Sequence, residues 1–256
     1  MAPAVFVVDT VADFSFVRPG VGTSLRAAME QASLSEDPSD TILFNIPGPA
    51  GQERLITLDP NLGPLPPITR PLVIDGYSQP GASVNTASVG TNATLAVRVD
   101  GSLVGNSGLL VNCDLNFGQV DGTVIRGLSI TGFETGVLIT QASGVTLEGN
   151  FLGVDPSGTG AGNGNNVGLN VESSSNIQIG GERAARNLIS GNSTFGAFLN
   201  EISDLRIQGN LIGTNADGTA AVPNGSTGLQ FLGGSNHLKG GGGTELGHVV
   251  AGNGGV

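Results

Sequence analysis

The sequence predicts an all-β fold, a parallel β-helix that follows an N-terminal cap containing one short α-helix. Short runs of Val, Ile and Leu alternate with Gly and Asn, and a segment beginning at Val145 recurs from Leu205. Residues 1–60 share neither feature. Gly accounts for 43 of the 256 residues and hydrophobic residues for 38%. This composition is typical of many short strands joined by tight turns.

The N-terminal segment predicts a strand, a helix and two further strands, in that order. "AVFVVDT", "DTILFNIP" and "RLITLD" are strand-like. Between the first two, Thr23 or Ser24 can cap a helix, which places four apolar residues on one face: Leu25, Ala28, Met29 and Ala32. Because an open first layer of strands is an aggregation edge, we expect residues 1–60 to cap the stack. Residues 61–256 should then form one continuous β-helix domain with a truncated C-terminal end.

The rest of the chain repeats. Gly149, Asn150 and Gly153 recur as Gly209, Asn210 and Gly213, and "NLISGN" (187–192) recurs as "HVVAGN" (248–253). Strand segments such as "VTLEGN" and "IQIGG" are too short to bury a face alone, so they must stack on neighbours. We expect each long unit to hold two or three passes of the chain plus an excursion loop. A propeller is disfavoured by the missing aromatic blade signature, and a leucine-rich repeat by the missing leucine frame.

Gly-Asn pairs end several of these strands. Asn150, Asn192, Asn210 and Asn253 each follow a glycine. Asn accepts the left-handed backbone of a sharp corner, and stacked Asn side chains can satisfy one another along the axis. We expect a structural role for these four residues.

Charge and residue usage exclude several functions. The net charge is −11, and the 10 Lys and Arg residues are scattered, which argues against binding to nucleic acid or anionic membranes. No apolar run reaches the ~18 residues of a membrane span. Cys113 can form no intrachain disulfide and is expected to be a buried thiol. His237 and His248 have no third ligand at metal-site spacing, so no metal site is predicted.

The excursion loops "GVDPSGTG" (153–160) and "GTNADGTA" (213–220) are the candidates for a binding site. Asp155, Asn215 and Asp217 offer oxygen atoms in Gly-containing turns, which can hold Ca²⁺ or a glycan. The other interpretation is that they form plain Asx and Pro-Ser-Gly turns.

Several segments resemble the secreted bacterial right-handed parallel β-helix repeat proteins of the pectate-lyase-like superfamily. They are "TSLRAAMEQA", "ITRPLVIDGYSQPGA", "VIRGLSITGF", the paired excursion loops and "RNLISGN". Residues 23–28 also resemble the C-S-L-R-E-A motif of one subgroup, and depart from it at the first and fifth positions. The resemblance implies a right-handed β-helix and an extracellular or cell-surface location.

The superfamily includes pectate lyases, polygalacturonases and epimerases, so we compared the residues that each chemistry needs. A lyase needs a Lys or Arg base beside acidic residues, but Lys239 lies in a glycine-rich turn and the spacing places no Arg beside an acidic cluster. An inverting glycosidase needs two carboxylates roughly 6.5–9.5 Å apart. Glu148, however, recurs as Gln208, and Glu172 as Leu232.

The sequence therefore predicts a structural or adhesive segment of a larger secreted or surface protein, without catalysis. The alternatives are a lyase or glycoside hydrolase acting on an acidic polysaccharide, and a Ca²⁺-dependent glycan-binding module. A polysaccharide or surface glycan is the expected partner, and end-to-end self-association is expected as well. Aromatic residues make up only 4% of the chain, and the Phe residues are expected mostly in the core. A flat aromatic sugar platform is therefore not predicted.

Overall fold

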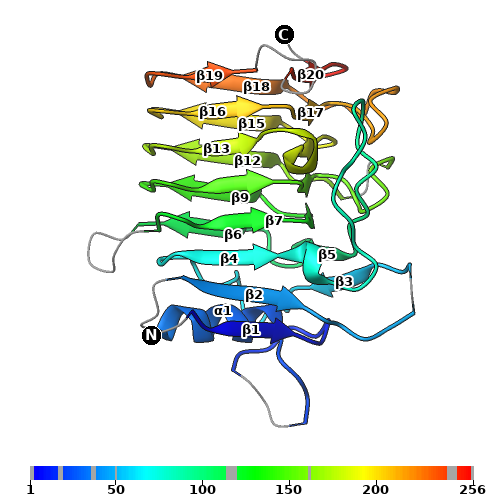
Figure 1. Cartoon of the computed structure of the whole chain (residues 1–256), viewed down its shortest axis with the longest axis vertical. Helices are drawn as coiled ribbons and strands as arrows, with labels where there is room; N and C mark the ends of the chain where they lie inside the picture. The colour runs from blue at the N-terminus through cyan, green and yellow to red at the C-terminus, as the bar shows by residue number, and fades with distance from the viewer. Residues whose placement is uncertain are drawn as a thin grey trace.

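Consecutive strands of the chain fall into three different sheets, and each strand pairs in parallel with the strand one layer away (Figure 1). The computed structural model describes residues 3–16, 20–35, 39–49, 51–113, 120–160, 163–240 and 247–254. From Leu72 onward the chain passes from an eight-stranded to a seven-stranded to a five-stranded sheet and then returns, whereas before Leu72 it enters only the eight- and seven-stranded sheets. One such pass is called a layer below.

The strands of each sheet are given in spatial order. The eight-stranded sheet contains β1 (Val5–Val8), β2 (Asp40–Phe44), β4 (Leu72–Asp75), β7 (Val124–Arg126), β10 (Thr146–Glu148), β13 (Gln178–Gly180), β16 (Arg206–Gln208) and β19 (Leu238–Lys239). The seven-stranded sheet contains β3 (Arg54–Thr57), β5 (Val97–Asp100), β8 (Leu128–Thr131), β11 (Phe151–Leu152), β14 (Leu188–Ile189), β17 (Leu211–Ile212) and β20 (Val249–Val250). The five-stranded sheet contains β6 (Ser107–Asn112), β9 (Thr135–Thr140), β12 (Val167–Glu172), β15 (Phe195–Asn200) and β18 (Thr227–Leu232).

The sequence repeat corresponds to two layers. Thr146 of β10 pairs with Gln178 of β13, which pairs with Arg206 of β16. Long excursions follow β11 and β17, whereas the layer between them carries its excursion after β13, in the short 3-10 helix η2 (Arg183–Ala185). Because the position of the excursion alternates from layer to layer, similarity returns only at every second layer.

Rows of aliphatic side chains fill the space between the sheets. Ile125, Leu147, Ile179 and Ile207 occupy the same inward position on four successive strands and are fully buried. Full burial of such a side chain contributes about 1.5–3 kcal/mol. One hydrophobic cluster extends from Val8 to Ile212, so residues before and after position 60 share a core.

Helix α1 (Leu25–Leu34) lies at the N-terminal end of the stack (Figure 1). Ser24 caps it, since its Oγ accepts a hydrogen bond of 3.0 Å from the Ala27 N–H. The helix contacts β1 and β2. Its buried apolar face contains the predicted residues Leu25, Ala28, Met29 and Ala32.

The contacts of the buried Arg26 explain why the "SLRAA" segment has an arginine at this position. Its guanidinium bonds both carboxylate oxygens of Asp13, at 2.9 and 2.8 Å. It also donates to the carbonyl oxygens of Gly63 and Pro64. With 3% of its surface exposed, Arg26 ties the helix to the loop that enters it and to the loop that follows β3.

A long segment after η1 (Gly76–Ser78) runs alongside several layers, on the outer side of the seven-stranded sheet (Figure 1). Leu95, near its end, packs in a second hydrophobic cluster with Phe151, Leu188 and Leu211. Arg186 holds the segment by donating to the Gly90 carbonyl oxygen at 2.5 Å. This packing covers the outer face of the seven-stranded sheet.

Candidate functional site

The outer face of the five-stranded sheet carries aliphatic, aromatic, amide and carboxylate side chains. Four of its strands, β6, β9, β12 and β15, follow one burial pattern, with half-buried residues at the first, fourth and sixth positions. The register pairs these positions across β12 and β15. We call the following residues the aromatic–amide face: Val167, Asn170, Glu172, Phe195, Phe198 and Asn200.

Two aromatic rings lie on this face. Phe195 and Phe198 are half-exposed, and their ring centroids are 5.5 Å apart with the planes tilted by 49°. The prediction that Phe residues lie mostly in the core holds for Phe44, Phe133 and Phe151, but it is wrong for this pair. Alternation explains the position of Phe198, because its neighbour Leu199 points inward and is buried, so Phe198 points outward. It does not explain Phe195, because two consecutive buried residues, Gly196 and Ala197, interrupt the alternation.

Amides position carboxylates beside the rings. Asn170 Nδ2 donates to Glu172 Oε1 at 2.8 Å. One layer earlier, at the edge of the face, Glu134 Oε1 accepts from Asn166 Nδ2 at 2.7 Å. Asn166 in turn accepts from the hydroxyl groups of Ser193 and Thr194. The polar side chains of this face therefore form two separate hydrogen-bonded groups.

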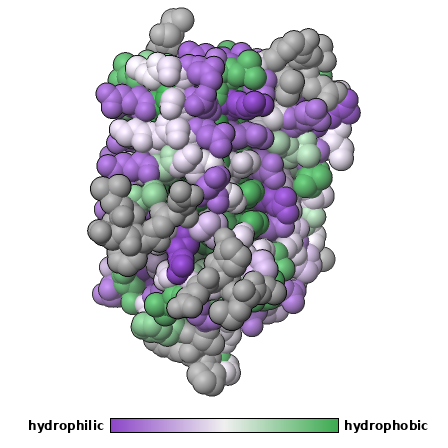
Figure 2. Space-filling model, turned by 60° about the vertical axis from the view of Figure 1, so that its left-hand side comes forward, coloured by the Kyte–Doolittle hydropathy of each residue, from purple (hydrophilic) through white to green (hydrophobic). Residues whose placement is uncertain are grey.

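The face carries negative charge and no positive charge. None of the five strands of the sheet contains Lys or Arg. Glu172, Glu134 and the exposed Glu201, which directly follows β15, take part in none of the ion pairs formed among the described residues. On the side seen in Figure 2, hydrophilic and hydrophobic residues are mixed without one continuous hydrophobic patch.

A second charged group lies on the eight-stranded sheet and corrects the prediction that no Arg stands beside acidic residues. Arg126 lies between Asp75 and Glu148 on neighbouring strands. Its Nη2 is 2.9 Å from Asp75 Oδ2 and its Nη1 is 3.4 Å from Glu148 Oε1. The sequence could not bring these residues together, because Asp75 and Arg126 are separated by a layer of irregular length.

The ion pairs around Arg126 do not suit a role for this residue as a proton acceptor. The hydrogen bond to Asp75 is the main cause that raises the pKa of Arg126, so the guanidinium keeps its proton. Burial, with smaller effects of Glu148 and Asp75, raises the pKa of the neighbouring Tyr77. The Tyr77 hydroxyl donates to the Gly149 carbonyl oxygen at 2.9 Å. Asp75, Arg126 and Glu148 form an ion-pair network, and Tyr77 lies next to it.

The predicted turn asparagines lie in two separate ladders. Asn150 and Asn210 belong to one between the eight- and seven-stranded sheets, in which Asn187 Nδ2 donates to Asn210 Oδ1 at 2.9 Å. Its last member is His248, whose Nδ1 accepts from the Asn210 N–H at 3.3 Å. Asn187 lies outside the Gly-Asn pattern of the sequence because it follows Arg186 rather than glycine.

The second ladder lies between the seven- and five-stranded sheets. Asn192 Nδ2 donates to Asn224 Oδ1, and Asn224 Nδ2 donates to Asn253 Oδ1, both at 2.8 Å. Asn165 begins this ladder by donating to Asn192. Asn224 was missed because it follows a proline, and Asn165 because it lies in the unaligned end of an excursion.

The expectation that asparagine adopts the left-handed backbone at these corners is wrong. Glycine, not asparagine, takes the left-handed backbone: Gly149 and Gly209 have φ values of 65° and 67°. Asn150 and Asn210 have no positive φ. The asparagine is needed for its side chain, which satisfies backbone and side-chain groups of adjacent layers.

The two excursion loops lie side by side. The Ala216 N–H donates to the Gly158 carbonyl oxygen at 2.8 Å. Asp155 Oδ1 accepts from the N–H of Ser157 at 2.9 Å, which is an Asx turn. Asn215 Oδ1 accepts from the N–H groups of Thr219 and Ala220.

These contacts fit the turn interpretation of the loops. Among the described residues, the side chain of Asp217 takes part in no ion pair. Among the described residues, no three His, Cys, Asp or Glu side chains are grouped to hold a metal ion. His237 bonds the Ile202 carbonyl oxygen at 2.9 Å. Cys113 is half-buried against the core rather than fully buried.

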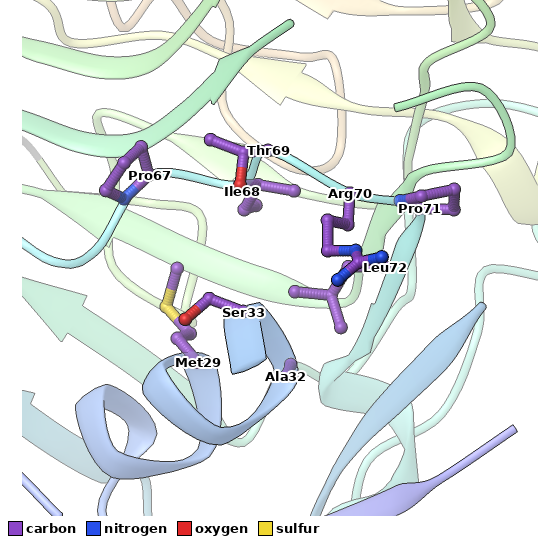
Figure 3. Close-up of a pocket in the computed structure, with 9 residues that line it drawn as sticks. All are labelled: Met29, Ala32, Ser33, Pro67, Ile68, Thr69, Arg70, Pro71 and Leu72. Atoms are coloured by element: carbon purple, nitrogen blue, oxygen red, sulfur yellow. The ribbon is translucent and has the colours of Figure 1, made fainter. Parts of the chain in front are cut away.

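The cavities of the described part do not offer a better site. The one between α1 and residues 67–72 (Figure 3) has a volume of about 10 Å³, which is room for about one water molecule. A groove of about 450 Å³ follows the corner at Asn176, Asp204, Arg206 and Asn236, with no aromatic lining. Within the described residues, no helix is both long and apolar enough to cross a membrane.

Comparison with known protein families and with curated protein sequences finds no match for this chain.

Proposed function

We propose that this chain is a structural and adhesive segment of a secreted or cell-surface protein, and that it binds a polysaccharide or surface glycan on the aromatic–amide face. We further propose that its three sheets form a right-handed parallel β-helix of the pectate-lyase-like kind. Connections between parallel strands are right-handed in about 98% of cases, which supports this handedness.

The observation that carries the binding proposal is the half-buried Phe195–Phe198 pair on the outer face of the sheet, with the hydrogen-bonded amide of Asn170 on the neighbouring strand. Aromatic rings present a large apolar surface at low cost in conformational entropy. The amide of Asn200 and the carboxylate of Glu172, both half-buried, can exchange hydrogen bonds with hydroxyl groups. Apolar rings with a few oriented polar groups are the usual composition of a binding site for a small polar ligand.

A binding assay with matched variants tests this proposal. Retardation of the protein in gels that contain single polysaccharides should be lost in Phe195→Ala/Phe198→Ala. Phe16, which is 66% exposed and remote from the sheet, provides the control Phe16→Ala, which should bind like the unmodified chain. Equal retardation of all three proteins would refute the site. Thermal unfolding of each protein shows whether it is folded.

Cleavage of an acidic polysaccharide is the alternative activity. A lyase base must accept a proton, and the raised pKa of Arg126 opposes this. We therefore expect no new absorbance from unsaturated products when polyuronates are incubated with the chain. Activity that disappears in Arg126→Gln would replace the adhesive proposal by the enzymatic one.

We also propose end-to-end association through the outermost strands β18, β19 and β20. Leu232, Leu238 and Val250 are 43–50% exposed there. Sedimentation should show association that rises with concentration and weakens in Leu238→Ser/Val250→Ser. A monomer at all concentrations would refute it.

A further inference from the structure

We infer that the glycan taken by the aromatic–amide face carries amino groups, so that its class is a cationic amino-sugar polymer rather than a polyuronate. This inference rests on the proposed glycan binding and deepens it. The acidic polysaccharide expected from the sequence resemblance would carry negative charge, whereas the ligand inferred here carries positive charge.

The distribution of charge carries the argument. Glu134 precedes β9, Glu172 ends β12 and Glu201 follows β15, so the three glutamates lie on the layer of the aromatic pair and on the two layers before it. Consecutive layers are about 4.8 Å apart, so these carboxylates lie within the length of a short oligosaccharide. No ion pair of the described residues neutralises them. A polyuronate laid across the rings would bring its carboxylates against them.

The hydrogen bonds of the aromatic–amide face also favour a cationic amino-sugar polymer. Asn170 and Asn166 use their Nδ2 groups on Glu172 and Glu134. The carboxylates are thereby held in place while they keep free acceptor positions, because each carboxylate has about four lone-pair sites. An ammonium group offers three donors and no acceptor. A donor-rich cation therefore complements a face whose held groups are acceptors.

The rings supply the second part of the match. A sugar lying on Phe198 would bring substituents to its register neighbours Asn170 and, two positions further along the strands, Glu172 and Asn200. A cation near an aromatic face is also attracted by the ring quadrupole. Stacking and charge pairing would thus act on the same ligand residue.

Calorimetric titration with three oligosaccharides of equal length tests the inference. The probes are an oligomer of glucosamine, its fully N-acetylated counterpart, which has the same backbone without the charge, and an oligogalacturonate. The buffer is mildly acidic, so that amines are protonated, but stays above the usual Glu pKa of ~4.3. The glucosamine oligomer should bind most tightly, and Glu172→Gln should weaken it about two- to five-fold, the effect of an exposed ion pair.

Matched variants separate specific recognition from general attraction to an acidic protein. Glu182→Gln removes the same charge at an exposed position of the excursion after β13 and should leave the affinity unchanged. Phe198→Ala should weaken the glucosamine oligomer and its acetylated counterpart alike. Polylysine serves as a cation without sugar rings, and Phe198→Ala should weaken its binding less than that of the glucosamine oligomer.

Any other result of these titrations overturns the inference, as follows. Equal affinity for the charged and acetylated oligomers, or tighter binding of oligogalacturonate, overturns the inference and leaves the glycan-binding proposal standing. Binding of none of the three oligomers overturns both. An effect of Glu182→Gln as large as that of Glu172→Gln, or loss of discrimination between glucosamine and polylysine, reduces the observation to charge attraction and also overturns the inference.

Discussion

The side-chain amide of Asn192 donates a hydrogen bond of 2.8 Å to the Oδ1 of Asn224, which occupies the same corner one layer along the stack. Both residues are buried, and the same bond recurs between Asn224 and Asn253. Because each amide bridges two layers, a change in one residue removes hydrogen bonds on both sides.

Asn192→Ala is therefore expected to destabilise the fold strongly. It removes the hydrogen bonds from Asn165 Nδ2 to Asn192 and from Asn192 Nδ2 to Asn224 Oδ1 and to the Leu152 carbonyl oxygen, although Asn165 and Asn224 each keep one other partner. Each lost hydrogen bond costs about 0.5–1.5 kcal/mol, so the free energy of unfolding should fall by roughly 2–4 kcal/mol. Denaturant titration measures this loss. Asn61→Ala, at an exposed loop position, is the control and should change stability by less than about 0.5 kcal/mol.

The buried pair of Arg26 and Asp13 gives a second prediction. Arg26→Met leaves the Asp13 carboxylate buried without its cation and should lower the unfolding free energy by about 3–5 kcal/mol. The double variant Asp13→Asn/Arg26→Met should lose less than the sum of the single changes, because the two residues are coupled. Strictly additive losses would contradict a direct interaction between them.

Gly149 is expected to tolerate no side chain, for two separable reasons. Its φ of 65° disfavours any L residue by about 1–2 kcal/mol, and an added Cβ would overlap the Tyr77 hydroxyl. Gly63 has a similar φ of 69° with open space around it. Gly149→Ala should therefore destabilise the chain more than Gly63→Ala. Equal losses in thermal unfolding would mean that Tyr77 moves aside without cost.

His248 makes stability depend on pH. It ends the first ladder: its Nδ1 accepts from the Asn210 N–H, so its Nε2 carries the hydrogen and donates to the Ile207 carbonyl oxygen at 2.8 Å. Burial is the main cause that lowers its pKa below the usual 6.5. The folded chain thus resists a proton that the unfolded chain accepts.

The contribution of His248 to stability is present above the unfolded pKa of about 6.5 and is lost as the pH falls below it. His248→Asn, which restores the asparagine of the ladder, should flatten this part of the stability profile. Denaturant titrations at several pH values check it. An unchanged slope in the variant would assign the pH dependence to other groups.

The sequence by itself determined the layered parallel strands, the helix over residues 25–34 and the positions of the sharp corners. These features depend on local spacing: the alternation of Val, Ile and Leu, the cap at Ser24, and glycine at positive φ. Repeat similarity also indicated the Asn corners, although it missed Asn187 and Asn224, which lack the preceding glycine.

Only the tertiary structure decided which side chains meet between layers. The position of the excursions alternates, so the number of residues between stacked positions is irregular, and the pairing of Arg126 with Asp75 or of Asn170 with Phe198 depends on register. A shift of register by one residue would turn each of these side chains to the opposite face. The physical reason is that lateral hydrogen bonding between strands fixes the register, and no local sequence signal records which strand becomes the neighbour.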